Sequence, residues 1–578
     1  MLLLKGKRRL LTLLASMLAM TLSGCEITFG SSSSDIPDSS DSSAPSSSES
    51  PSDDSSSYSR DENGFKDFDP SYFVPVNDPN DKKEKNQVKF SDYVDGMELY
   101  PKMKMYVAGE EVPVYKVNIN ENRTWKADAG VRVMSAYATI AIKGKVKISL
   151  QCAFNPLQDV VIRPLGKNVP YEIDSARWVI SFDIDSPGQY LIETRQRTLH
   201  LFVNEIKDED ISNCIVFKRG IHTKDNDSRI NSNNEITIHS NEHIYLEDGA
   251  VVRAKFVATD ASNFSIKGPG IIDGSTFPRN PNEGTATIPL DFNFCSNFTL
   301  EDFSIMDPAG WAYNIYFANG VTIKNTKIMS SRSNGDGISI QSCNNVNVEG
   351  CFLRTWDDSL VVKNYVNWRT QAEGSTSGVH FSDCLIVTDL AQCMEVGYET
   401  IGEKMEDISF SNITVLHAFH KPVMSIHNGN NAKIRNVRYE NITVEDASMG
   451  RGDGNPYLFD FDVSYSPTWS DNHKKTGLGD IDGVDVSNVL VLSGYENPKV
   501  KVTGSMETRD GYTKEAHYVK NVHFKNVSVL GEAVDGSYAG YVNSYAQGVT
   551  FENTAAATGA TYTKPDISSY GNNVERVK

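Results

Sequence analysis

A short phrase that returns ten times constrains the fold of this chain more than any other feature. Each copy reads apolar, polar, apolar, polar, then Asn, Gly or Asp, as in Val321-Thr-Ile-Lys-Asn325. The copies begin at Phe264, Phe298, Val321, Val346, Val379, Ile408, Val437, Val484, Val522 and Val549. Neighbouring copies are mostly about 23 to 34 residues apart, which is the period of stacked coils. β-branched residues and turn asparagines replace the fixed leucines of a leucine-rich repeat. We therefore predict an all-β chain with a right-handed parallel β-helix of about ten coils over 205–578.

The segment 86–204 has a different pattern, with short runs of alternating polarity separated by turns. Val112 to Asn118, Thr139 to Ile142, Val146 to Leu150 and Trp178 to Phe182 read as strands of period two. Tyr190 to Glu193 and Leu199 to Val203 complete the set. This spacing of strands and turns predicts a β-sandwich ahead of the β-helix.

The first residues indicate a targeting signal. Lys5, Lys7, Arg8 and Arg9 precede an apolar stretch, which ends in Leu22-Ser-Gly-Cys25. This ending resembles a bacterial lipobox, so we expect 1–25 to be a lipoprotein signal peptide with lipidation at Cys25. The Ser- and Asp-rich segment 26–85 has little to bury and is expected to be a disordered linker. Together they predict a protein held by a lipid anchor at a bacterial cell surface.

The remaining composition excludes several classes of protein. A net charge of −19 argues against nucleic acid as a partner. The seven cysteines after Cys25 show no CxxC or CxxH spacing, so we expect neither zinc nor a full disulfide framework, and no cofactor. Asn263, Asn297, Asn412, Asn441 and Asn526 lie in N-x-[ST] sequences at recurrent turn positions, where they are expected to adopt left-handed backbone conformations rather than carry glycans.

Each coil carries a second strand upstream of the repeated phrase. Stacking these strands with Ile338, Leu360, Met394 and Met424 inward sends the intervening residues outward. The outward residues are Asn314, Tyr316, Ser339, Gln341, Val361, Lys363, Glu395, Ser425 and His427. They are predicted to form one polar wall, because neighbouring coils lie about 4.8 Å apart.

Three carboxylates stand beside this wall. Asp336 lies in Asn334-Gly-Asp-Gly, and Asp357 and Asp358 precede the next strand. Stacking places Asp336 and Asp358 at equivalent positions on adjacent coils. Like charges this close raise the pKa of at least one carboxyl group. A protonated acid facing ionised carboxylates can protonate a glycosidic oxygen while a base activates water, so the trio predicts a glycoside hydrolase.

These motifs resemble the polygalacturonase family of β-helix hydrolases. The resemblance lies in Asn334-x-Asp336, the Asp-Asp pair 21 and 22 residues later, and Lys363 five residues after the second Asp. A sandwich ahead of the helix is more similar to the dextranase and isopullulanase family. Both families are inverting hydrolases. The resemblance implies Asp357 as general acid, Asp336 and Asp358 as the groups that activate water, and Asn334 and Lys363 as sugar-binding or supporting residues.

The chain departs from polygalacturonases on the next two coils. Their Gly-His-Gly and Arg-Ile-Lys motifs are replaced by Cys393-Met-Glu-Val-Gly397 and Met424-Ser-Ile-His427. Without that cationic clamp, and with Glu395 adding negative charge, a neutral glycan is favoured over a polyuronate. Gln341, Glu395, Tyr398 and His427 become candidate sugar contacts, and Trp356 and Tyr365 candidate stacking platforms.

Two other functions stay open. In a polysaccharide lyase the three aspartates would hold Ca²⁺, and an Arg or Lys would remove a proton α to a uronate carboxylate. Lys363 is the one groove-facing lysine in this stacking, and the outward wall lacks arginine. In a non-catalytic adhesin or glycan-binding lipoprotein, the aspartates would be turn residues. We expect a monomer with a polysaccharide as its partner.

Overall fold

The computed structural model describes residues 59–73, 85–120, 132–156, 160–195, 197–279, 287–450, 454–494, 499–536, 539–552 and 574–576. These residues form strands, apart from two short 3₁₀ helices, η1 (Pro70–Phe73) and η2 (Leu165–Lys167), and the connecting turns. Across the described ranges, no helix has the length and apolarity needed to cross a membrane. The expected signal peptide, Cys25 and most of the expected linker lie outside the described residues.

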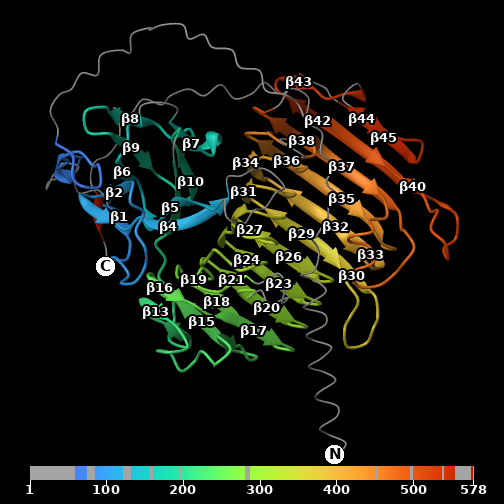
Figure 1. Cartoon of the computed structure of the whole chain (residues 1–578), viewed down its shortest axis with the longest axis horizontal. Helices are drawn as coiled ribbons and strands as arrows, with labels where there is room; N and C mark the ends of the chain where they lie inside the picture. The colour runs from blue at the N-terminus through green and yellow to red at the C-terminus, as the bar shows by residue number, and fades with distance from the viewer. Residues whose placement is uncertain are drawn as a thin grey trace, which may run out of the picture.

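The N-terminal domain is the predicted β-sandwich (Figure 1). One sheet has the order β3-β2-β6-β9-β8 and the other β46-β1-β5-β11-β10-β7, with β4 also paired to β5. The strands are β1 (Asn86–Lys89), β2 (Met103–Val107), β3 (Glu110–Val112), β4 (Tyr115–Asn120), β5 (Arg132–Lys143), β6 (Val146–Cys152), β7 (Val161–Arg163), β8 (Tyr171–Asp174), β9 (Val179–Ile184), β10 (Gly188–Glu193), β11 (Thr198–Glu205) and β46 (Val574–Arg576). Apolar residues that alternate along these strands fill one core between the sheets.

The second domain is a parallel β-helix, as the repeats predict (Figure 1). One face is an eleven-stranded sheet, one strand more than the ten coils expected. Its strands, in order, are β14 (Glu235–Thr237), β17 (Lys255–Thr259), β20 (Leu290–Asn293), β23 (Tyr313–Tyr316), β26 (Ile338–Gln341), β29 (Leu360–Asn364), β32 (Met394–Thr400), β35 (Met424–Asn428), β37 (Tyr457–Val463), β39 (Lys499–Thr503) and β44 (Ala539–Val542).

The other faces are a twenty-one-stranded sheet, which contains all ten copies of the repeated phrase. Its strands are β12 (Ile215–Phe217), β13 (Gly220–His222), β15 (His243–Leu246), β16 (Ala250–Val252), β18 (Ser265–Lys267), β19 (Ile271–Asp273), β21 (Ser296–Glu301), β22 (Ser304–Met306), β24 (Asn319–Lys324), β25 (Lys327–Met329), β27 (Asn344–Glu349), β28 (Phe352–Thr355), β30 (Gly374–Ser382), β31 (Leu385–Thr388), β33 (Gly402–Ser411), β34 (Thr414–Ala418), β36 (Lys433–Val444), β38 (Ile481–Val491), β42 (Val519–Val529), β43 (Glu532–Ala533) and β45 (Ala546–Glu552). A separate hairpin joins β40 (Ser505–Met506) to β41 (Ala516–His517).

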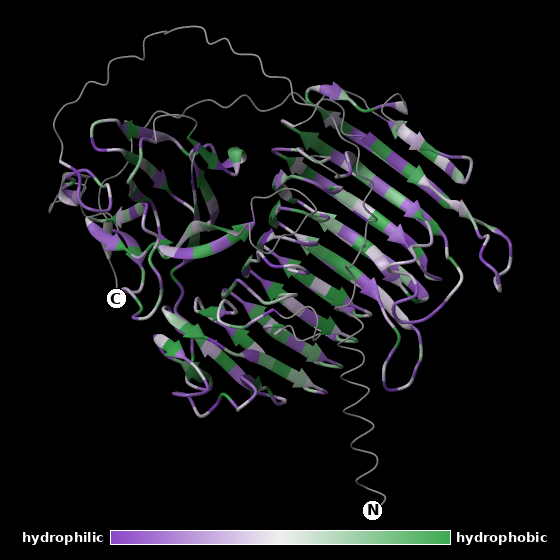
Figure 2. Cartoon of the chain, viewed as in Figure 1, coloured by the Kyte–Doolittle hydropathy of each residue, from purple (hydrophilic) through white to green (hydrophobic). Residues whose placement is uncertain are grey.

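Stacking of equivalent residues stabilises the coils. Phe381, Phe410 and Tyr439 occupy one register position, and successive ring centroids are 4.9 and 5.0 Å apart. Hydrophobic and hydrophilic residues alternate along the strands, with the apolar ones turned inward (Figure 2). The predicted turn asparagines have positive φ angles: Asn263 (56°), Asn297 (53°), Asn412 (54°), Asn441 (55°) and Asn526 (53°). Six of the seven described cysteines are buried, and all seven are free thiols.

Part of the expected linker is folded, so that prediction is wrong for 59–73. Arg60 and Lys66 form an isolated antiparallel β-bridge. Arg60 Cζ and Lys66 Nζ lie 4.4 and 4.3 Å from the centroid of the Trp178 ring. Phe65 is buried, and Gln151 of the sandwich donates a 2.6 Å hydrogen bond to the Lys66 carbonyl. An aromatic residue and two cations over a tryptophan provide contacts that the serine run lacks.

The sandwich packs against the twenty-one-stranded sheet. Tyr137 and Phe202 of the sandwich share a buried cluster with Met329, Phe352 and Leu416 of the helix. The eleven-stranded sheet is therefore the face available for a site.

Candidate active site

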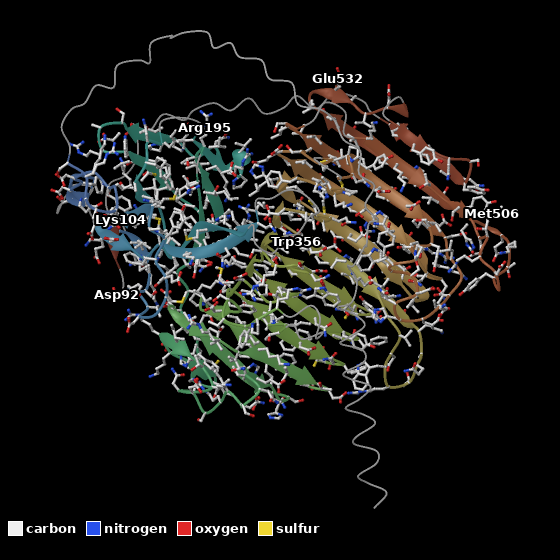
Figure 3. The ribbon with its side chains drawn as sticks, viewed as in Figure 1. Asp92, Lys104, Arg195, Trp356, Met506 and Glu532 are labelled. Atoms are coloured by element: carbon white, nitrogen blue, oxygen red, sulfur yellow. The ribbon has the colours of Figure 1, made fainter. Side chains whose placement is uncertain are left out.

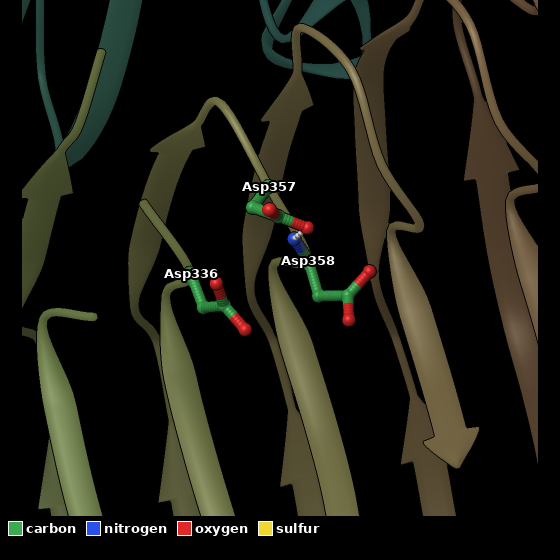
Figure 4. Close-up of side chains that lie close together, drawn as sticks. All are labelled: Asp336, Asp357 and Asp358. Atoms are coloured by element: carbon green, nitrogen blue, oxygen red, sulfur yellow. Dashed lines mark hydrogen bonds between the residues drawn. The ribbon is translucent and has the colours of Figure 1, made fainter. Parts of the chain in front are cut away.

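The three predicted aspartates converge at the N-terminal ends of two central strands of the eleven-stranded sheet. Asp336 precedes β26 and Asp358 precedes β29, and the pairing of Ile338 with Leu360 places the two aspartates at equivalent positions. Asp357 lies beside them, and one oxygen from each carboxylate lies within 4.8 Å of the others. Figure 4 shows the three side chains meeting between adjacent coils.

Backbone hydrogen bonds fix the turn that carries the pair. The Asp358 amide donates to Asp357 Oδ1 at 3.1 Å, and the Gln392 amide donates to Asp358 Oδ1 at 3.1 Å. Thr355 Oγ1 donates to the Asp357 carbonyl at 2.7 Å. By contrast, Asp336 Oδ1 is buried and has no hydrogen-bond partner among the described residues. Such an oxygen suits a protonated carboxyl group or contact with a reacting molecule.

The trio cannot be fully ionised near neutral pH. Asp336 and Asp358 are only 3% and 9% exposed. Burial, and then the charges of Asp357 and Asp358, raise the pKa of Asp336 well above its usual range. Burial, and then Asp357, raise the pKa of Asp358 to about 8. Burial also raises the pKa of Asp357. At least one proton is therefore shared within the group at neutral pH.

Lys363 faces this group but forms an ion pair with Glu399. Lys363 Nζ lies 3.0 Å from Glu399 Oε2, and both side chains are buried. The sequence analysis named Lys363 and missed Glu399. Side chains alternate along a strand, so an inward Val396 predicts that residues 397 and 399 point outward. This alternation could have identified Glu399.

Asn334 binds a second cation that the sequence analysis also missed. Arg279 Nη2 donates to Asn334 Oδ1, and Arg279 Nη1 donates to the Ala309 carbonyl at 3.0 Å. Asp336 and Asp357 lie within electrostatic reach of this guanidinium. No sequence motif marks Arg279, because it lies two coils before the carboxylates and no repeated phrase contains it.

Gln341 belongs to the wall but is held in a side-chain ladder. Its Nε2 donates to Asn314 Oδ1 at 2.7 Å, and Asn314 Nδ2 donates to Asp291 Oδ1 at 2.7 Å. Gln341 is only 3% exposed. The ladder fixes the orientation of these amides on the sheet.

Glu395 is on the predicted face but is not open to a substrate. It is 1% exposed; Ser425 donates to Oε2, and His427 Nδ1 lies 2.8 Å from Oε1. The ring of Tyr398 stacks on His427, with centroids 4.5 Å apart and planes 2° apart. Tyr398 remains half-exposed and is the member of this set most able to meet a sugar. The prediction of Glu395 and His427 as direct sugar contacts is not supported, because the two buried side chains are hydrogen-bonded to each other.

His427 continues into a larger charged cluster. Its Nε2 lies 3.4 Å from Asp460 Oδ2, and Lys501 Nζ lies 3.0 Å from Asp460 Oδ1. Burial lowers the pKa of His427, but Glu395 and other neighbours raise it well above its usual value. We call Glu395, His427, Asp460 and Lys501 the paired cluster.

The two candidate stacking platforms are buried. Trp356, labelled in Figure 3, is 6% exposed and Tyr365 is 4% exposed. Tyr365 instead packs against the edge of His473, 4.4 Å between centroids. Trp311, on the coil before Asp336, is a better candidate, because it is half-exposed and Lys363 Nζ lies 5.7 Å from its ring centroid.

Comparisons with known proteins find glycoside hydrolases. The family model described as Glycosyl hydrolases family 28 matches residues 212–450, which include all three aspartates. A plant protein of Arabidopsis thaliana named "Probable polygalacturonase" is 24% identical over 247 residues, 41% of this chain and 49% of its own length. The chain thus spans about half of that relative. The resemblance to the polygalacturonase type is confirmed.

Solved structures with related folds are more distant. Dex49A from Penicillium minioluteum is 14% identical, with 80% of this chain and 96% of that chain covered and a TM-score of 0.47. The family 28 exopolygalacturonase of Yersinia enterocolitica is 13% identical, with coverage of 84% and 99% and a TM-score of 0.41. The fold assignment here rests on the strand ladders themselves.

Proposed function

We propose that this chain is a glycoside hydrolase that uses three aspartates to cleave a polysaccharide. The observation that carries the proposal is the convergence of Asp336, Asp357 and Asp358, two of them almost fully buried. Asp357 donates a proton to the leaving glycosidic oxygen. In the reacting form the shared proton lies on Asp357. Asp336 and Asp358 hold a water molecule, and the one of them that is ionised accepts the proton of that water as it attacks the anomeric carbon.

The stereochemical outcome separates two routes. An inverting enzyme needs room for water between acid and base, with carboxyl groups about 6.5 to 9.5 Å apart, whereas direct attack by a carboxylate needs about 5 to 5.5 Å. The nearest oxygens of this trio lie within 4.8 Å, which makes direct attack the competing route. Inversion is proposed here because Asp336 and Asp358 lie at equivalent positions on adjacent coils, where both can bind one water.

The lyase alternative loses Lys363 as its base. Lys363 is paired with Glu399 at 3.0 Å, and Glu399 raises the pKa of this lysine well above its usual value although burial opposes the charge. A lysine held as ammonium cannot remove a proton α to a carboxylate.

The charge argument for a neutral glycan is weaker than the sequence indicated. Glu395 was expected to repel a polyuronate, but the charge of His427 offsets it. The missing clamp still favours a neutral glycan, since Ser425 and His427 replace the arginine and lysine of the related family. A substrate panel must therefore include both classes.

The test is reducing-end release from dextran, pullulan, arabinan, galactan and polygalacturonate, with the anomeric configuration of the first product followed by NMR. We expect one substrate to give an inverted product. Asp357→Asn should lower kcat by about 10²- to 10⁴-fold, the usual contribution of a general acid. A retained product would assign direct attack instead. Unsaturated products, or binding without cleavage in wild type, would overturn the proposal.

We also propose that the enzyme acts while anchored at a cell surface. The support is the Leu22-Ser-Gly-Cys25 sequence and the Ser- and Asp-rich segment that follows it. Membrane fractions of cells that express wild type should contain the protein and incorporate labelled fatty acid, and Cys25→Ser should abolish both. Labelling that persists in Cys25→Ser would contradict this assignment.

A further inference from the structure

Lys363 and Glu399 come from two neighbouring strands, and both lie within electrostatic reach of the trio of aspartates. Lys363 lies on β29 and is 8% exposed, and Glu399 lies on β32 and is 5% exposed. The register between these strands shifts after Val362, so that Asn364 pairs with Thr400. This shift places residue 399 next to residue 363, and the two charges lie 3.0 Å apart.

The charged groups that face Asp357 come from several elements. Asp336 and Asp358 are the other members of the trio, and Lys363 and Arg279 are the cations. Glu399 is the fourth carboxylate within reach, and His473, on the loop after β37, faces it in turn. Burial lowers the pKa of this histidine.

Lys363 has an effect on the trio that opposes the proposed chemistry. An ammonium beside buried carboxyl groups favours their ionised form. A glycoside hydrolase needs one of them to carry a proton at working pH. With Glu399 in place the pair is neutral as a unit, and its field on Asp357 is that of a dipole rather than a full charge.

We propose that Glu399 is a positioning residue that acts through Lys363: by neutralising this lysine it allows Asp357 to hold the proton that the reaction consumes. The inference rests on the proposed hydrolase function for its catalytic meaning. The predicted effect of Glu399 on the proton of Asp357 does not depend on that function.

The first test is the pH dependence of kcat/KM in three variants. Glu399→Gln leaves Lys363 uncompensated, so the alkaline limb should move to lower pH by about one unit. Lys363→Met removes the cation, so the limb should move to higher pH. The double variant should return close to wild type. Glu301→Gln, which removes a half-buried carboxylate paired with Lys207 and Lys267 on the twenty-one-stranded sheet, is the matched control and should leave the limb in place.

A second readout does not need activity. The infrared band of protonated carboxylic acids is recorded as a function of pH for wild type and for each variant. The spectrum of the same protein carrying Asp357→Asn is subtracted, so that the difference reports the proton on Asp357. In Glu399→Gln the band should disappear at lower pH than in wild type.

The outcomes separate the two proposals. A shifted band without hydrolysis of any glycan supports the charge inference and overturns the function. Hydrolysis that falls equally at every pH in Glu399→Gln, with the band unmoved, overturns the inference and leaves the function standing. Shifts of the same sign in Glu399→Gln and Lys363→Met also overturn it, because a merely structural role would give that result.

Discussion

Two groups of buried acids lie along the same sheet and behave in opposite ways. In the trio of Asp336, Asp357 and Asp358, the carboxylates face one another. Lys363, on the strand that follows Asp358, forms an ion pair with Glu399. In the paired cluster, Asp460 contacts both His427 and Lys501. The pKa of Asp358 is raised to about 8, whereas that of Asp460 is held far below its usual range although burial opposes this.

The difference shows that burial alone does not make a carboxyl group reactive. Asp460 is 1% exposed, less than Asp358 at 9%, yet its cationic neighbours keep it ionised. The two cations that face the trio have other partners: Lys363 is paired with Glu399, and Arg279 donates to Asn334 and to the Ala309 carbonyl. This contrast supports the proposal that the trio is catalytic, and it favours a structural role for the paired cluster.

The largest effect on stability is expected from Asp460→Asn. Loss of this charge leaves the His427 imidazolium and the Lys501 ammonium short of a partner, which should cost about 3 kcal/mol. The free energy of unfolding can be compared from urea titrations at neutral pH. Asp357→Asn is the control, because removing one of three repelling carboxylates should leave stability unchanged or increase it. Equal losses in both variants would erase the contrast between the groups.

A smaller effect is expected in the pH dependence of stability. The folded-state pKa of Asp358 is about 8 and its unfolded value about 3.9, so the stabilising proton is present at low pH and is lost as the pH rises toward 8. Wild type should therefore lose about 2.7 kcal/mol relative to Asp358→Asn between pH 5 and pH 7, at about 1.36 kcal/mol for each pH unit. Melting temperatures of both proteins at each pH measure this difference.

Asp460 gives the opposite sign and serves as comparison. Its folded-state pKa is depressed, so its contribution is present at neutral pH and is lost as the pH falls below about 3.9. The difference between wild type and Asp460→Asn should thus be flat between pH 5 and pH 7. A slope of the same sign for both aspartates would contradict the assignment.

Much of this site was predictable, because the β-helix converts sequence period into spatial register. The repeated phrase gave the coils, and the offset between Asp336 and Asp358 gave their stacking, which the pairing of Ile338 with Leu360 confirms. The turn asparagines were predictable for the same reason, since each copy ends where the chain must adopt a positive φ angle.

The errors arise where the chain leaves this period. Glu399 lies beyond Gly397, where the predicted strand ends and where the register with β29 shifts, and Arg279 lies outside every repeat. Glu395 was placed on the correct face, but sequence alone could not show that Ser425 and His427 would bind both of its oxygens. Local period predicts which face a residue is on, while its partners come from neighbouring coils and loops.

The smallest expected effect concerns Tyr398, which stands between the two groups. Its ring stacks on His427 of the paired cluster, and the next residue, Glu399, serves the trio. Tyr398→Leu should cost about 1 kcal/mol of ring stacking, and it should raise KM about fivefold with kcat little changed if the exposed ring face meets a sugar. Tyr398→Phe keeps the ring and should retain the wild-type KM. If Phe and Leu variants lose affinity equally, the hydroxyl group makes the contact; if kcat falls instead, Tyr398 belongs with the trio and the boundary between the groups must be moved.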